Sequence, residues 1–289
     1  MNRRSAIAGV LVLFSIASLI FAQRRFGGRG GFYRGNDGTD YKMPRELPSG
    51  STGTPTWTNA PGFENDVFTF ARIHYTSGYR GNIWMTDTPD SDLNLSYRLQ
   101  QMTSLKVNPD GRFLRLTDPA LSEYPWIYIV EPGSLEFNPE EVVGLRKYLL
   151  NGGFLMIDDF WGEREWENLE AEIKRVFPDR QFKELPMEHP IFHSVFEIKG
   201  PKNKLQVPNI RVGADSEFTG ITWERSDAHE VHIRGIFDDK GRMMVIATHN
   251  TDNGDGWERE GESAYYFKNF SEKISYPLGI NILFYAMTH

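Results

Sequence analysis

Apolar and polar positions follow two different periods along this chain. Within residues 142–150 the apolar side chains recur at helical spacing, at Val142, Leu145, Tyr148 and Leu149. Asn151-Gly152-Gly153 ends this stretch, because glycine tolerates the left-handed backbone that closes a helix. Residues 154–157 then form an uninterrupted apolar run, which is typical of a strand buried on both faces. The pattern predicts a helix packed on a sheet and, after it, a central buried strand.

The same periods predict the other elements of the chain. We expect strands over 67–75, 113–116, 126–130, 231–237 and 242–248, and helices over 88–105, 138–150, 163–177 and 277–287. Periodicity fades around 199–230, where we expect a loop-rich insertion. Strands that alternate with helices, without an internal repeat, predict a three-layer α/β domain with a mainly parallel sheet over residues 63–289.

The first 62 residues have a different character. Arg3-Arg4 and the uncharged apolar run that follows have the layout of an export signal, so residues 1–22 are a signal peptide or, alternatively, an uncleaved signal anchor. Residues 23–62 are rich in Gly, Pro and Arg and lack an apolar period, which predicts a disordered linker. Its arginines can rest on anionic lipid headgroups, and an RNA-binding segment is the alternative. We therefore expect an exported bacterial protein, periplasmic or anchored in the membrane and facing the periplasm.

Charge and cysteine content exclude several classes of function. The net charge of −7 divides into +5 for residues 1–62 and −12 for the rest. An acidic domain is a poor match for a phosphate backbone, so nucleic acid is not the expected partner. The chain contains no cysteine, which excludes disulfides, thiolate metal sites and a cysteine nucleophile.

Polar residues follow four of the predicted strands, at the edge where open α/β sheets place their ligands. They are His74, Glu131, Asp158, Asp159, His249 and Asn250. Such a crevice can bind a divalent cation, supply an acid and a base, or fix a polar ligand. The candidates for catalysis are Asp158, Asp159, Glu131 and His249. Adjacent strand residues point to opposite faces, so at most one of the two aspartates faces the crevice.

Each candidate also has a purely structural interpretation. The aspartates can cap the helix that begins near Glu163, and a histidine at the end of a strand can be a hydrogen-bonded scaffold residue. His74, Trp161, Asn250 and Trp257 are the candidates for ligand binding. Residues 250–256 are similar to a calcium loop in composition. Their acids miss the alternating positions of an EF-hand, so a flexible polar loop is predicted, and no residue is assigned to a metal or cofactor.

Five blocks of sequence give the chain its family resemblance: FTFARIHY, PDSDLNLSYRLQQMTSLKVNP, YIVEPGSLEF, LRKYLLNGGFLMIDDFWG and EHPIF. Residues 67–288, which contain them, resemble the domain of unknown function 4159 family. That resemblance implies a fold of the flavodoxin-like, class I glutamine amidotransferase-like superfamily and an exported or membrane-bound protein. The chain departs from amidotransferases where Asp158 follows the central strand in place of a cysteine.

Two functional hypotheses follow from the residues and the resemblance. The first is a non-catalytic domain of the cell envelope that binds a protein partner or a small polar ligand, which the missing cysteine favours. The second is a hydrolase that uses the Asp/Glu/His crevice, with or without a divalent metal. The sequence alone leaves open whether the domain is an enzyme.

Overall fold

The computed structural model describes residues 41–63, 66–77 and 81–289, and the expected signal peptide lies outside these ranges. The sheet has seven strands in the order β2-β1-β3-β4-β7-β6-β5. Neighbouring strands from β2 to β7 are parallel, whereas β6 pairs antiparallel with β7 and β5. The strands are β1 Ala71–Ile73, β2 Arg112–Leu114, β3 Trp126–Val130, β4 Phe154–Asp158, β5 Lys183–Glu184, β6 His232–Phe237 and β7 Met243–His249.

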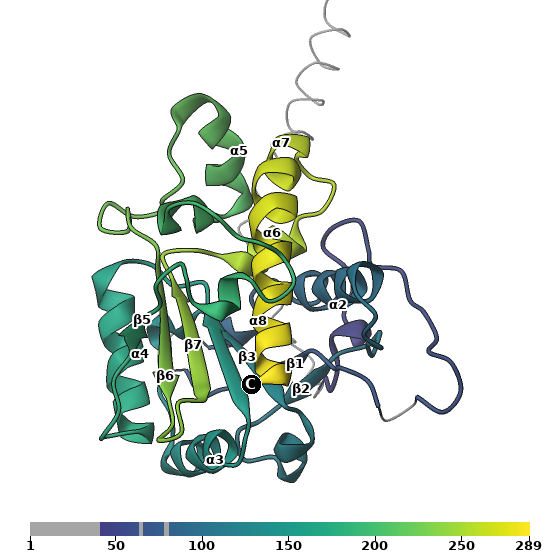
Figure 1. Cartoon of the computed structure of the whole chain (residues 1–289). Coiled ribbons are helices and arrows are strands. Elements are labelled where there is room, and N and C mark those ends of the chain that lie inside the picture. Colours follow the sequence, from purple (N-terminus) through teal and green to yellow (C-terminus); the bar gives the residue numbers. More distant parts are fainter. Residues whose placement is uncertain (1–40, 64–65, 78–80) are drawn as a thin grey trace, which may run out of the picture. The chain divides into compact units, whose positions relative to one another are not determined.

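Helices cover both faces of this sheet, which confirms the predicted three-layer α/β architecture (Figure 1). The larger ones are α2 Asp90–Met102, α3 Pro139–Leu150, α4 Gly162–Val176, α5 Ile210–Thr219 and α8 Tyr276–Thr288. Two shorter helices, α6 Asn253–Glu258 and α7 Ala264–Tyr266, precede the π-helix η7 Phe267–Ser275, which runs into α8. None of the helices in the described ranges has both the length and the apolar character that crossing a bilayer requires.

Successive side chains of β3 and β4 point to opposite faces of the sheet, so these strands contribute to a hydrophobic core on each face. Ile127, Ile129, Leu155 and Ile157 pack with α3 and α4, whereas Trp126, Tyr128, Phe154 and Met156 pack with α2 and α8. Every residue of both strands is buried, as the apolar run predicted. Figure 1 shows α8, in yellow, running along the strands in front of the sheet.

Local signals located several elements correctly. Helix α3 starts at a capping box, in which the Asn138 side chain accepts a hydrogen bond from the Glu141 N–H and the Glu141 carboxylate accepts one from the Asn138 N–H. Each bond satisfies a backbone donor that the first turn of a helix leaves free. The strands predicted over 231–237 and 242–248 form the hairpin β6–β7, which turns through residues 238–242.

Two segments differ from the sequence prediction. The expected insertion contains α5, whose N-terminus is capped by the Asn209 side chain and whose C-terminus is closed by Gly220 at φ +69°. Residues 250–256, predicted as a flexible loop, are buried, and residues 253–256 among them form the first part of helix α6. That helix was missed because its N-terminus depends on the Asp252 side chain, which accepts a hydrogen bond from the Asp255 N–H, and on partners distant in the sequence.

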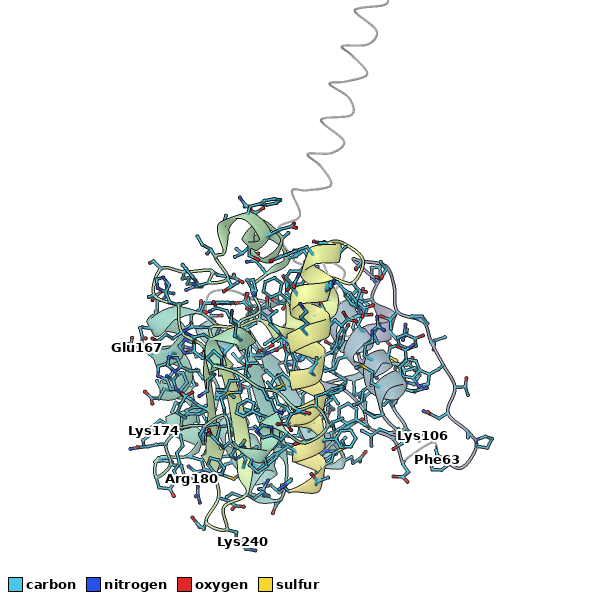
Figure 2. The ribbon with its side chains drawn as sticks, turned by 45° about the horizontal axis from the view of Figure 1, so that its top comes forward. Phe63, Lys106, Glu167, Lys174, Arg180 and Lys240 are labelled. Carbon is cyan, nitrogen blue, oxygen red and sulfur yellow. The ribbon has the colours of Figure 1, made fainter. Side chains whose placement is uncertain are left out.

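Residues 41–62, the described part of the expected linker, lie against the domain. The Trp57 indole donates to the Val107 carbonyl at 2.9 Å, and the Lys106 ammonium lies 6.0 Å from the centre of the Phe63 ring just beyond (Figure 2). The first contact satisfies a backbone carbonyl and the second pairs a cation with an aromatic ring, so neither depends on an apolar period along the sequence.

Candidate functional site

The loops at the carboxyl ends of the parallel strands contain residues with a left-handed backbone conformation. Among the described residues, positive φ outside glycine occurs at Asp87, Glu131, Asp159 and Asn250, with φ between 52° and 65°. Each of these residues follows one of the strands β1, β3, β4 and β7. Left-handed backbone disfavours residues with a side chain and concentrates at functional sites. The edge predicted from the sequence is therefore the place to look for a site.

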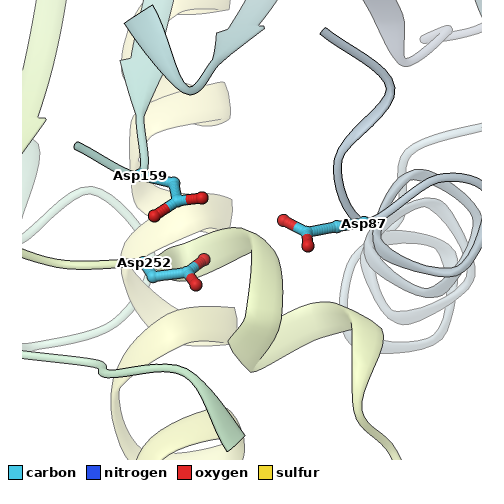
Figure 3. Close-up of side chains that lie close together, drawn as sticks. All are labelled: Asp87, Asp159 and Asp252. Atoms are coloured by element: carbon cyan, nitrogen blue, oxygen red, sulfur yellow. The ribbon is translucent and has the colours of Figure 1, made fainter. Parts of the chain in front are cut away.

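Three carboxylates meet at this edge. One oxygen from each of Asp87, Asp159 and Asp252 lies within 4.8 Å of the other two, and Figure 3 shows the three side chains facing a common space. Oxygens on opposite sides of a calcium ion are separated by about 4.8 Å, because each lies about 2.4 Å from the ion. The spacing thus suits a single cation between them.

A second group of acids adjoins the first and shares Asp87 with it. Asp87, Asp255 and Glu258 each place an oxygen within 4.8 Å of the other two. Arg259 lies beside this group, with its Nε 2.6 Å from a Glu258 oxygen and 3.7 Å from an Asp255 oxygen. One guanidinium thus offsets part of the negative charge of five carboxylates.

Asp87 is held where it can serve both groups. The residue is partly exposed, but its Oδ2 atom is shielded from solvent and accepts no hydrogen bond from any described residue. A methyl group on Gly254 would lie 2.4 Å from this oxygen, so only glycine allows the approach. A buried carboxylate oxygen without a donor is costly unless a proton or a cation satisfies it.

Burial and mutual repulsion change how these acids titrate. Burial is the largest cause that raises the pKa of Asp87, Asp159, Asp252 and Glu258 well above the ordinary carboxyl range, and neighbouring carboxylates raise each pKa further. Nearby Glu224 has its pKa raised to about 7, again mainly by burial. Acids in this state hold protons near neutral pH, or exchange them for a cation.

Asp158, the first of the two predicted aspartates, has a different role. Its carboxylate accepts hydrogen bonds from the Tyr128 hydroxyl at 3.1 Å, from the Thr248 hydroxyl, and from the backbone N–H groups of Asn253 and Gly254 at 2.9 and 3.1 Å. The Asn253 side-chain amide donates to it as well. Asp158 therefore joins β4 to the start of α6, and its oxygens are already occupied by donors.

His249 lies on the other face of the sheet from Asp158. Its ring stacks on Phe160 and Trp166, with ring centres 4.8 and 5.5 Å apart. It accepts a hydrogen bond from Arg234 through Nδ1 and donates to the Gly162 carbonyl through Nε2. Burial lowers the pKa of His249 to about 4, so the ring is neutral, and it belongs to neither acid group.

The remaining candidates take different positions. The Trp161 indole donates to Asp159 Oδ1 at 3.1 Å and so orients the carboxylate. Glu131 is close enough to Asp159 to raise the pKa of that carboxyl group. His74 stacks on Trp84, with ring centres 4.2 Å apart.

Two of the candidates for ligand binding have structural contacts instead. Asn250 accepts from the Gly162 N–H and donates to the Glu230 carbonyl, which fixes the loop after β7. Trp257 is fully buried against Tyr128, so its ring is part of the core and does not line a crevice.

Sequence reasoning did not identify Asp87, Asp252, Asp255 or Glu258. The last three lie in or just after the stretch whose composition resembles a calcium loop, so a signal was present there, although not in EF-hand register. No sequence pattern around Asp87 marks it as a site residue. Only the folding of the segment after β1 brings it close to the other acids. All members of both groups are carboxylates, the ligands that hard cations such as Mg²⁺, Ca²⁺ and Mn²⁺ prefer.

Comparison with known proteins identifies the family of this chain. No curated protein matches the chain significantly. The family model for the domain of unknown function DUF4159 matches residues 69–287, which is most of the chain and all of the site described above. The chain therefore belongs to the DUF4159 family.

Proposed function

We propose that this chain is a cation-dependent binding protein of the bacterial cell envelope. In this proposal a divalent cation is held by Asp87, Asp159 and Asp252, and the cation recruits a polar ligand or a protein partner to the crevice. The observation that carries the proposal is the meeting of three carboxylates from three separate loops within 4.8 Å. Buried charges in proteins are normally paired or bound to metal, and the ion pairs of Arg259 are with Glu258 and Asp255, outside this group.

The fold and the cellular location belong to the same proposal. The parallel strands β2-β1-β3-β4-β7 follow each other in the order 2-1-3-4-5 of flavodoxin-like proteins, whose ligands bind where the strand order reverses. That supports the flavodoxin-like and amidotransferase-like assignment implied by the family resemblance. The apolar run of residues 6–21 after two arginines supports export to the periplasm, free or membrane-anchored.

A hydrolase is the second candidate, and one observation favours it. Glu224, with its pKa raised to about 7 by burial, is close enough to Asp252 and Asp159 to affect their titration. A group that titrates near neutral pH beside a bound cation can act as a general acid or base. The version of this hypothesis that uses His249 has no support in the geometry, since that ring faces the opposite side of the sheet.

Cation binding is tested directly with the purified full-length protein. After removal of metals with EDTA, isothermal titration with Ca²⁺, Mg²⁺ and Mn²⁺ should show saturable binding, and bound cation should raise the melting temperature. Asp159→Asn should lower the affinity at least tenfold. Asp239→Asn is the matched control, because that side chain is 89% exposed on the β6–β7 hairpin. Absence of binding by the wild-type protein, or equal affinities of the two variants, would refute the proposal.

A further inference from the structure

The two acid groups overlap in a way that bears on how many cations the site holds. Asp87 belongs to both groups, with Asp159 and Asp252 in the first and Asp255 and Glu258 in the second. Carboxylates bridge metal ions about 3.5–4 Å apart in two-metal sites. A single residue shared by two adjoining sets of ligands is the arrangement such a bridge requires.

Asp87, which belongs to both groups, contributes an unsatisfied oxygen to each of them. Asp87 Oδ2 is shielded from solvent and accepts no hydrogen bond from the described residues. The Glu258 side chain is only 9% exposed, and its Oε2 forms an ion pair with the Arg259 Nε at 2.6 Å. Each group therefore contains a buried oxygen that still lacks a hydrogen-bond donor.

The charge of the cluster is compatible with two cations. Fully ionised, the five carboxylates and the Arg259 guanidinium carry a net charge of −4. Two divalent ions neutralise the ionised cluster completely, whereas with one divalent ion the remaining charge of −2 has to be removed by protons on two of the acids. Arg72, a buried cation that lowers the pKa of Asp87, is already engaged with Asp92 through hydrogen bonds at 3.0 and 3.1 Å.

We propose that the cation site is dinuclear, with Asp87 bridging one divalent ion held by Asp159 and Asp252 and a second held by Asp255 and Glu258. This inference rests on the proposed cation binding and extends it. Two adjacent ions would bind two oxygens of the same anionic ligand, so the expected ligand carries a phosphate-like or carboxylate-like group.

Manganese provides a readout of both number and distance. We expect the EDTA-treated full-length protein to bind two Mn²⁺ per chain by titration, with the electron paramagnetic resonance spectrum of a spin-coupled pair. Asp252→Asn and Glu258→Gln should each reduce the stoichiometry to one and give an uncoupled spectrum. Asp87→Asn should abolish the coupling, and Asp239→Asn should keep the wild-type result.

The outcomes distinguish this inference from the proposed function. One Mn²⁺ per wild-type chain would overturn the dinuclear site and leave the single-cation proposal standing, whereas none would overturn both. Two ions without spin coupling would overturn the bridging role of Asp87, and so would coupling that persists in Asp87→Asn. The wild-type stoichiometry and spectrum decide the matter even if a variant fails to fold, which circular dichroism would reveal.

Discussion

Asp158 and Asp159 are neighbours in the sequence, but their carboxyl groups have different surroundings. Asp158 receives hydrogen bonds from β3, β7 and α6, so it is a buried connector between elements. Asp159 adopts a left-handed backbone at φ 56°, which turns its side chain out of the strand alternation and towards Asp87 and Asp252. Only this second residue is available to a ligand.

Substitution by asparagine should separate the two roles. Asp158→Asn places amide hydrogens against groups that are themselves donors, so we expect a loss of about 1–3 kcal/mol in the free energy of unfolding. Asp159→Asn removes a repelled buried charge and keeps an oxygen for the Trp161 indole, so the metal-free protein should be as stable as wild type or more stable. Urea denaturation in EDTA measures both. Equal losses in the two variants would contradict this division of roles.

At the scale of elements, α6 builds the site. Its first backbone N–H groups donate to Asp158, and the Asp252 side chain caps its start. Asp255 lies in its first turn and Glu258 is its last residue. Helix α2 begins at Asp90, just after Asp87, and α2 and α6 pack on each other. The position of α6 relative to α2 therefore sets the distance between Asp87 and the other acids.

Gly254 in α6 allows this close approach. Gly254→Ala would place a methyl group 2.4 Å from Asp87 Oδ2, so the aspartate or the helix must move. We expect cation affinity to fall at least tenfold although every ligand is retained. Gly241→Ala is a control far from the acids, since nothing lies within 4 Å of that position, and its positive φ of 86° adds a stability cost that Gly254→Ala does not carry. Titration calorimetry on both variants measures the difference, and unchanged affinity in Gly254→Ala would show that Asp87 need not be held so closely.

At the scale of the whole molecule, the buried acids should make metal-free stability depend on pH. Glu224 has a pKa of about 7 when folded, above the ordinary carboxyl value. Its contribution to stability is therefore complete below the unfolded pKa and is lost as pH rises through about 7. His249 acts in the opposite sense, because its pKa is lowered to about 4 and its contribution is lost as pH falls towards that value.

The difference in stability between wild type and Glu224→Gln isolates the effect of Glu224, because His249 contributes equally to both proteins. Glutamine can still accept the hydrogen bond from the Asn209 N–H, which is 2.6 Å long in the wild type. In EDTA, the variant should gain stability relative to wild type as pH rises from 5 to 8, and added Ca²⁺ should reduce that gain. Denaturation curves at several pH values measure it. A difference independent of pH would mean that Glu224 titrates normally.

The sequence by itself determined the elements whose signals are local. The apolar run of β4, the capping box of α3 and the turn between β6 and β7 depend on residues close together in the chain, so period and turn chemistry sufficed to place them. The prediction of parallel strands also located the edge of the sheet where the site lies, because the carboxyl ends of parallel strands meet at one edge.

Only the tertiary structure decided which acids meet. Asp87, Asp159 and Asp252 come from three loops separated by long stretches of chain, and their convergence depends on strand order and on the packing of α2 against α6. Residues 250–256 were predicted as a loop for the same reason, since the N–H groups that start α6 are satisfied by Asp158 from a distant strand. The roles of Asp158 and His249 likewise follow from the face of the sheet that each side chain occupies, which a strand-end position alone does not specify.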